Sequence, residues 1–378
     1  MGNRPLTIMN LISGDGRGGS DRLALDISKG LKRHAHRVIW GSPSHCELKE
    51  EAARAGLEMY DLYPSGGNVM SGLPQLMTFC GDEKVDIVNS HQSQDRHLLL
   101  MARLRGLRSK IVFTRHCILS GMPLVGAIYF NAIDMNIAVS EAVKKSLLRG
   151  GVSSRRATRV YGGIDIDKFG NPPVEKTEQT RGKYYRSGAL NIGIVARYTG
   201  GKVFRPDDTT MKGHEFLFRA LTALPGDFNV LVLGVWGDRD IENLKAVAEY
   251  NGLPPGKLTF CDFQKDMATF YKIMDLNVLP SRNEGLGLTL IEAMAAGVPC
   301  IGADSGGIRE IIDDGVNGFL FAPGNSRALS EKIRTLREDA EIRDLFIRNG
   351  KEKVERLFGI ERTVRETEKI FYGLVART

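Results

Sequence analysis

The chain has 378 residues, more than a single hydrophobic core usually supports, so we expect two domains. With 42% hydrophobic and 26% charged residues, the composition is that of a globular protein, and no apolar run reaches the ~20 residues of a membrane span. The five cysteines are scattered without a CxxC pair, which disfavours a disulfide framework and a zinc site and favours a reduced, cytoplasmic protein.

The formal charge of +7 is unevenly distributed along the chain. Residues 1–170 hold 23 Lys and Arg against 16 Asp and Glu, whereas residues 171–378 hold 29 of each. A basic half attracts anionic partners such as acidic lipids, phosphorylated acceptors or nucleic acid, although it is equally compatible with an ordinary basic surface. We disfavour nucleic acid because no basic patch interleaved with aromatic residues is present.

In the first half, short apolar runs alternate with helical patterns, which predicts a parallel α/β sheet. The strands are expected at residues 6–12, 37–40, 85–89, 111–114 and 137–139, and helices at 20–31 and 98–104. Gly14, Gly16 and Gly19 fit the dinucleotide pattern G-x-G-x-x-G. A nicotinamide enzyme is disfavoured, because the second strand is followed by Gly41-Ser42-Pro43 and no carboxylate precedes Glu47.

The expected strand at 111–114 leads into Arg115-His116, so His116 lies at the carboxyl end of the strand, where open α/β sheets bind ligands. A lone histidine there is more often structural than functional. His91 and Asp95 are weaker candidates beside it.

Residues 173–187 are polar and lack periodicity, and we expect them to link a domain at 1–172 to one at 188–357. Strands are expected in this second half at 190–196, 230–233, 258–260, 276–279, 300–301 and 319–321, and helices at 327–357 and 361–374.

Residues 278–299, VLPSRNEGLGLTLIEAMAAGVP, predict a strand, a glycine loop and a helix from 288 to 296. The start of such a helix attracts anions such as a diphosphate. Glu284 in the loop suits the hydroxyls of a sugar, and Glu292 on the helix suits a ribose. Taken alone, the two carboxylates are more often solvated surface groups, but the small residues around them leave room for close backbone approach.

This segment closely resembles the donor-site motif of the family 4 retaining glycosyltransferases, with their two glutamates separated by seven residues. The flanks Pro280-Ser281 and GVPCIGADSGGIREIIDDGVNGFLF also match, as does VSEA at 139–142. The resemblance implies the GT-B fold, in which two Rossmann-like parallel-sheet domains face each other across a cleft. It also implies that the last helix crosses back, so that residues from about 358 to 378 belong with residues 1–172.

The resemblance also implies roles for individual residues. Arg197 and Lys212 would clamp the donor diphosphate, Glu284 would hold the sugar, and His116 would lie near the sugar or the acceptor. The remaining donor-binding residues implied in this way are Gly18, Gly19, Gly234, Phe263, Gly285, Leu286, Gly287, Leu288 and Glu292.

The sequence departs from the family pattern in the spacing between the arginine and the lysine that would bind the diphosphate. Fifteen positions separate Arg197 from Lys212, whereas the family usually has about five, a distance at which Lys202 stands. We prefer Lys212 because Lys212-Gly213 and the helix after it match the family context. The insert at 198–211, which contains Asp207 and Asp208, is a candidate flap over the donor.

The expected function is metal-independent and cofactor-independent sugar transfer with retention, in lipopolysaccharide, exopolysaccharide or glycolipid synthesis. A UDP-sugar is favoured as donor and GDP-mannose is the alternative. The rival functions are a nucleotide-sugar epimerase of the same fold and a non-catalytic nucleotide-sugar-binding subunit. The basic clusters, Lys29, Lys32, Arg33 and Arg37 and then Arg103, Arg105, Arg108 and Lys110, suggest a cytoplasmic protein with peripheral contact to an anionic membrane surface.

Overall fold

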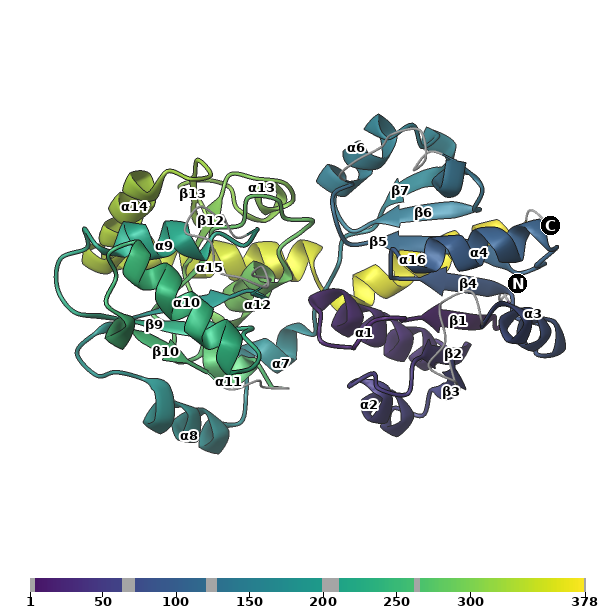
Figure 1. Ribbon diagram of the computed structural model, residues 1–378, viewed down its shortest axis with the longest axis horizontal. Helices are drawn as coiled ribbons and strands as arrows, with labels where there is room; N and C mark the ends of the chain where they lie inside the picture. The colour runs from purple at the N-terminus through teal and green to yellow at the C-terminus, as the bar shows by residue number, and fades with distance from the viewer. Residues whose placement is uncertain (1–3, 63–71, 120–127, 199–210, 262–265, 377–378) are drawn as a thin grey trace. The chain divides into compact units, whose positions relative to one another are not determined.

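The computed structural model describes residues 4–62, 72–119, 128–198, 211–261 and 266–376 (Figure 1). The chain divides into two compact units. The first comprises Met1–Ile164 with Phe358–Thr378, and the second comprises Asp165–Leu357. Each unit contains one parallel sheet covered by helices, the arrangement expected for Rossmann-like domains.

The sheet of the first unit has the strand order β3-β2-β1-β4-β5-β6-β7, with all neighbouring strands parallel. Its strands are β1 (Thr7–Leu11), β2 (Arg37–Ser42), β3 (Glu58–Asp61), β4 (Ile87–Ser90), β5 (Lys110–Arg115), β6 (Met135–Ala138) and β7 (Ala157–Arg159). The central strands are buried on both faces, so they appear in the sequence as mainly apolar runs, interrupted by buried polar residues such as Asn10 and Asn89.

The helices of the first unit connect and cover these strands. They are α1 (Gly19–Arg33), α2 (Lys49–Arg54), α3 (Leu73–Asp82), α4 (Asp95–Leu104), α6 (Glu141–Arg149) and α16 (Ile360–Val375). One hydrophobic core, which includes Met9, Val88, Leu98 and Phe113, lies between the sheet and helices α3 and α4. The hydroxyl of Ser140 caps α6 by accepting the N–H of Val143 at 3.1 Å.

The sheet of the second unit has the order β10-β9-β8-β11-β12-β13, and its strands are also parallel. The strands are β8 (Leu190–Val195), β9 (Phe228–Leu233), β10 (Leu258–Phe260), β11 (Leu276–Leu279), β12 (Cys300–Ala303) and β13 (Phe319–Phe321). The helices are α7 (Ile166–Gly170), α8 (Val174–Tyr184), α9 (His214–Leu221), α10 (Asp238–Tyr250), α11 (Ala268–Tyr271), α12 (Leu288–Ala296), α13 (Ile308–Ile311), α14 (Ser326–Glu338) and α15 (Ala340–Leu357).

The structure differs from the sequence expectation at the predicted linker. Helix α8 occupies Val174–Tyr184, and these residues belong to the second unit, which begins at Asp165. Of the eleven residues of α8, Tyr184 is the buried one. A helix that packs through so little of its surface needs no apolar stripe, so its sequence lacks the periodicity by which helices are identified.

None of the helices in the described ranges is long and apolar enough to cross a membrane.

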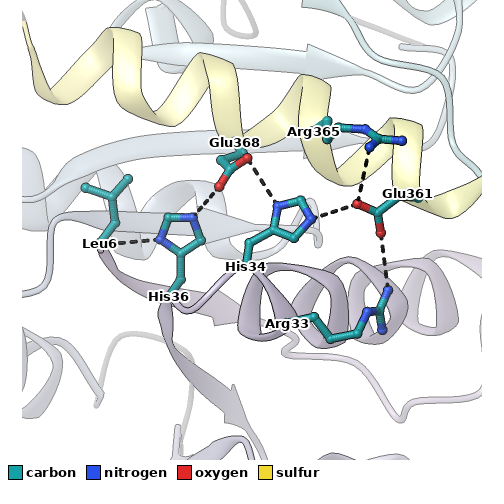
Figure 2. A network of polar contacts seen from close by, with 7 residues as sticks. All are labelled: Leu6, Arg33, His34, His36, Glu361, Arg365 and Glu368. Atoms are coloured by element: carbon teal, nitrogen blue, oxygen red, sulfur yellow. Dashed lines mark hydrogen bonds and ion pairs between the residues drawn. The ribbon is translucent and has the colours of Figure 1, made fainter. Parts of the chain in front are cut away.

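The last helix, α16, is fastened to the rest of the first unit by a polar network in which the His36 side chain is fully buried (Figure 2). The Leu6 N–H donates to His36 Nδ1 at 3.0 Å, so the proton of this neutral ring lies on Nε2, which contacts Glu368 Oε1 at 2.8 Å. The other oxygen of Glu368 lies 3.2 Å from His34 Nδ1, and His34 Nε2 lies 2.7 Å from Glu361. Helix α16 therefore ties the start of β1 and the end of α1 together from a distance of more than 300 residues in sequence.

We predict that Glu368→Ala lowers the free energy of unfolding by about 1–3 kcal/mol, because it leaves the fully buried His36 N–H without an acceptor. Equilibrium denaturation of the whole chain measures this loss. Glu366→Ala is the matched control on the same helix: Glu366 pairs with Arg362 on the surface, and its loss is expected to cost under about 0.5 kcal/mol. Equal stabilities for the two variants would contradict the proposed fastening.

Candidate functional site

In the second unit, three predicted residues follow three neighbouring strands. Arg197 comes after β8, Gly234 after β9 and Glu284 after β11, and β8 lies between the other two strands in the sheet. Because the strands are parallel, their carboxyl ends lie at one edge of the sheet. The fold therefore gathers these residues, which lie far apart in sequence, into one region.

Gly234 allows the loops after β8 and β9 to approach closely. Its φ is +94°, and a Cβ at this position would lie 2.5 Å from the carbonyl oxygen of Ala196. The Tyr198 N–H donates to the Gly234 carbonyl at 3.0 Å, which holds the backbone on both sides of Arg197. The exposed Arg197 guanidinium carbon lies 5.4 Å from the centroid of the Trp236 ring, so the cation rests against an aromatic face.

Lys212 and Glu284 form an ion pair, with Nζ 2.7 Å from Oε2. Both side chains are partly enclosed, at 29% and 15% exposure. The Arg282 N–H donates to the Met211 carbonyl at 3.1 Å, and Gly213, at φ +73°, sits so close to Pro280 that any side chain there would overlap its carbonyl. The loop carrying Lys212 is thus fixed against the loop between β11 and α12.

The start of α12 is shaped by glycines. Gly287 is the N-cap residue at φ +102°, and Leu286 beside it is buried at 3% exposure. The Gly307 N–H donates to the Glu284 carbonyl at 2.9 Å, and a Cβ at Gly307 would lie 2.6 Å from Leu286 Cα. The first N–H groups of a helix have no intrahelical acceptor, so this backbone is suited to an anion.

Glu292 lies on α12 and is held by a residue that the sequence analysis missed. The Tyr271 hydroxyl donates to Glu292 Oε2 at 2.7 Å, and the Tyr271 side chain is fully buried. Burial, followed by the nearby carboxylate, raises the pKa of Tyr271 well above its ordinary value, so the hydroxyl remains a donor. Nothing in the sequence indicates this pairing, because the short helix α11 carries no motif.

In the first unit, the candidate residues follow β1, β4 and β5, which are also neighbours in the sheet. Gly18 is the N-cap residue of α1 and Gly19 its first residue. The Gly18 N–H donates to Asp21 Oδ2 at 3.1 Å, and the Gln92 side chain donates to the other oxygen of Asp21. The glycine loop is therefore connected to the loop after β4.

The histidines after β4 and β5 contact each other. His91 Nδ1 lies 3.0 Å from His116 Nε2, and His91 Nε2 lies 2.9 Å from the side-chain nitrogen of Asn89. Burial and then the charge of Arg115 lower the pKa of His116 to about 3, while burial and then His116 lower that of His91 well below its ordinary value. Both rings are therefore neutral at pH 7.

Asp95 is fully buried at the start of α4, where it accepts the Ser90 hydroxyl at 2.7 Å, and burial raises its pKa to about 6. This enclosure leaves the carboxylate no exposed surface with which to contact a ligand.

Other predicted residues lie outside the described ranges: Phe263, Lys202, Asp207 and Asp208. Of the two alternative diphosphate-binding lysines, Lys212 is the one that lies within the described ranges. Across the described ranges, no three His, Cys, Asp or Glu side chains form a group that could hold a metal ion.

Two family models match the chain, one in each half. The model described as "Glycosyltransferase Family 4" matches residues 17–168, and the model described as "Glycosyl transferases group 1" matches residues 205–353. The first range contains Gly18 and His116 and the second contains Lys212, Glu284 and Glu292, whereas Arg197 lies between the two matched ranges.

Among characterised relatives, the chain is 29% identical to the capsular polysaccharide biosynthesis glycosyltransferase CapM of Staphylococcus aureus, over 64% of this chain and 62% of that protein. It is 27% identical to the sulfoquinovosyl transferase of Arabidopsis thaliana, over 60% of this chain and 42% of that protein. These matches span less than two thirds of the relatives' own lengths.

Solved structures share the fold over nearly the whole chain. A glycosyltransferase from Rickettsia africae matches with a TM-score of 0.85 and 23% identity, covering 100% of both chains. Anabaena HepE, in complex with UDP and glucose, matches with a TM-score of 0.83 and 20% identity, covering 97% of this chain and 99% of that one. Both units therefore have the architecture of the GT-B fold.

Proposed function

This chain belongs to the family 4 glycosyltransferases with the GT-B fold, and on that premise we propose that it transfers a sugar from a nucleotide-diphosphate sugar to an acceptor hydroxyl. The observation that carries the proposal is the Lys212–Glu284 pair beside the start of α12. A cation, a carboxylate and a helix N-terminus are the groups needed to bind a diphosphate joined to a sugar.

In this proposal the donor diphosphate replaces Glu284 as the partner of Lys212. Arg197 contacts the same diphosphate, and the first amides of α12 donate to its oxygens. As the bond between the anomeric carbon and the phosphate oxygen breaks, negative charge develops on the leaving nucleotide, and these groups stabilise it. Since the charges belong to the chain itself, we propose that transfer needs no divalent metal and continues in EDTA.

We assign different roles to the two carboxylates, Glu284 and Glu292. Glu284, released from Lys212, accepts hydrogen bonds from the hydroxyls of the donor sugar. Glu292 binds the ribose, and Tyr271 fixes one of its oxygens so that the other is oriented for the ligand.

We propose that transfer retains the anomeric configuration. The acceptor oxygen attacks the face from which the diphosphate departs, and the acceptor's proton passes to the departing phosphate oxygen. Positioning of the two substrates then supplies much of the rate. The anomeric coupling of the product in proton NMR tests this step, and an inverted product would reject it.

A UDP-sugar is the favoured donor, with GDP-mannose as the alternative. The preference is supported by the UDP and glucose bound in the Anabaena protein. For the acceptor we propose a lipid-linked or polysaccharide chain, in keeping with the capsular polysaccharide named for the Staphylococcus relative. Lipopolysaccharide, exopolysaccharide and glycolipid synthesis are all compatible with such an acceptor.

Lys212→Ala is expected to leave the fold intact and to lower the transfer rate by about 100- to 1,000-fold, because one charge that stabilises the leaving group is lost. The rate is measured as the transfer of radiolabelled sugar from the nucleotide sugar to a polysaccharide acceptor. Lys257→Ala, which breaks a comparable surface ion pair with Asp227, serves as the control and should transfer normally. Full activity in Lys212→Ala would reject the assignment and redirect attention to Lys202.

A thermal-shift panel of UDP, GDP and ADP identifies the base. UDP is expected to raise the melting temperature most, and Glu292→Ala to reduce that rise, because binding to the native state stabilises it in proportion to affinity. If GDP gives the larger shift, GDP-mannose replaces the UDP-sugar. Conversion of the nucleotide sugar without an acceptor would indicate an epimerase, and binding without turnover would indicate a non-catalytic subunit.

We also propose a peripheral contact with anionic membranes, located at Arg105, Arg108 and Lys110. In the other basic cluster, the residues already have partners: Lys29 with Glu51, Arg37 with Glu58, Arg33 with Glu361, and Lys32 with the Gly56 carbonyl. Arg105 and Arg108 are exposed, which supports their being the contact residues.

Replacing both Arg105 and Arg108 by Glu should weaken co-sedimentation with anionic vesicles at low salt by about tenfold or more, since each cation near such a surface contributes about 1 kcal/mol. Replacing both Arg327 and Arg334 in the second unit by Glu changes the net charge by the same amount and should leave co-sedimentation with the vesicles unchanged. Absence of wild-type binding at low salt would rule out the contact.

A further inference from the structure

A continuous chain of buried hydrogen bonds leads from the backbone of α1 to the ring of His116. Its members are Ser28 on α1, Asn10 on β1, Asn89 on β4, and His91 after β4. All four are at most 5% exposed. Asn10 and Asn89 are direct partners in the parallel register of β1 and β4, so the sheet itself brings the two amides together.

The direction of this chain follows from its first member. The Ala24 carbonyl can only accept, and the Ser28 hydroxyl donates to it at 2.7 Å. The Ser28 oxygen is then the acceptor for Asn10 Nδ2 at 2.8 Å, which turns Asn10 Oδ1 toward Asn89. Asn89 must present its nitrogen to that oxygen, and it does so at 3.0 Å.

The amide nitrogen of Asn89 has two protons, and the second points at His91 Nε2 at 2.9 Å. The carbonyl oxygen of the same amide accepts the Thr114 hydroxyl at 2.9 Å, so all three polar positions of Asn89 are occupied in one orientation. His91 Nε2 is therefore an acceptor. A neutral imidazole has one N–H, which must then lie on Nδ1, and His91 donates it to His116 Nε2 at 3.0 Å.

We propose that Asn89 and His91 are positioning residues that hold His116 in the neutral tautomer with its proton on Nδ1. His116 then presents a hydrogen-bond donor to the reacting sugars, and its one lone pair is occupied by His91. It cannot take the acceptor's proton through either nitrogen. This deepens the proposed function and rests on it: the donor phosphate remains the group that accepts the proton.

Several further observations agree with a neutral donor. The low pKa values of both rings keep them uncharged at neutral pH, so each retains one N–H. Within the described ranges no group accepts a hydrogen bond from His116 Nδ1, and the His116 side chain is only partly buried. In the proposed complex this N–H donates to a sugar oxygen.

The tautomers are measurable without any substrate. In the full chain labelled with ¹⁵N-histidine, long-range ¹H–¹⁵N correlations at neutral pH should show His116 and His91 protonated at Nδ1 and bare at Nε2. His116→Gln and His91→Gln, made separately, assign the signals among the seven histidines. A proton on Nε2 of wild-type His116 would overturn the proposal.

Asn89→Asp tests the direction of the chain. A carboxylate in place of the amide donor can only accept from His91 Nε2, so both histidines should change to the Nε2–H tautomer. His116 would then offer a lone pair where it had offered a proton, and the transfer rate should fall about 100-fold with little change in the KM for the donor. Unchanged tautomers in a folded Asn89→Asp protein would also overturn the proposal.

His97→Gln is the matched control, because His97 is an exposed histidine whose Nδ1 lies 3.0 Å from the Tyr129 hydroxyl. It should leave both tautomers and the transfer rate unchanged. The experiments distinguish failure of the proposed transferase function from failure of the proposed hydrogen-bond chain. The expected tautomers without transferase activity would reject the function and keep the hydrogen-bond chain, whereas active enzyme with Nε2–H at His116 would reject the chain and keep the function.

Discussion

The parallel pairing of the strands is the constraint on which the rest of this molecule depends. Parallel strands cannot be joined by tight hairpins, so each returns through a helix, and all their carboxyl ends meet at one edge. In the second unit this places the loops after β8, β9 and β11 side by side. Gly213 and Gly234 then let those loops approach to distances that a side chain would prevent, and Gly307, after β12, does the same against the loop after β11. Residues from four separate stretches of sequence become one surface in this way.

The nearby partners of each cation, and not the net charge of a unit, determine which cations can bind an anion. The excess of cations in residues 1–170 suggested a broadly basic surface, yet the first of the two basic clusters is largely matched by carboxylates of the same unit. The second unit has no net charge over residues 171–378, and still places Arg197 and Lys212 in the one connection between β8 and α9. Lys212 is held by Glu284 rather than by solvent. An anion that binds there takes the place of the Glu284 carboxylate, so Lys212 exchanges one negatively charged partner for another, which lowers the cost of desolvating the lysine.

Buried neighbours determine what the candidate site groups can do chemically. Tyr271 contributes a hydroxyl that orients Glu292, and Asn89 and His91 contribute the bonds that orient His116. None of these three contacting residues is part of a recognisable motif. Tyr271 contacts Glu292 and His91 contacts His116 through a single hydrogen bond each, and Asn89 acts on His116 through His91. In a buried region such bonds constrain both geometry and protonation.

The sequence by itself determined the α/β class, most of the strands, and the strand–loop–helix segment around Glu284, because apolar runs, glycines and helix ends are local features. It did not determine helix α8, which has almost no buried face, or the strand β3 at the edge of the first sheet. Only the tertiary structure decided the pairing of Lys212 with Glu284, the support of Glu292 by Tyr271, and the hydrogen-bond chain to His116. The Lys212–Glu284, Tyr271–Glu292 and Asn10–Asn89 contacts join residues 21 to 79 positions apart, and no local pattern encodes which strands become neighbours.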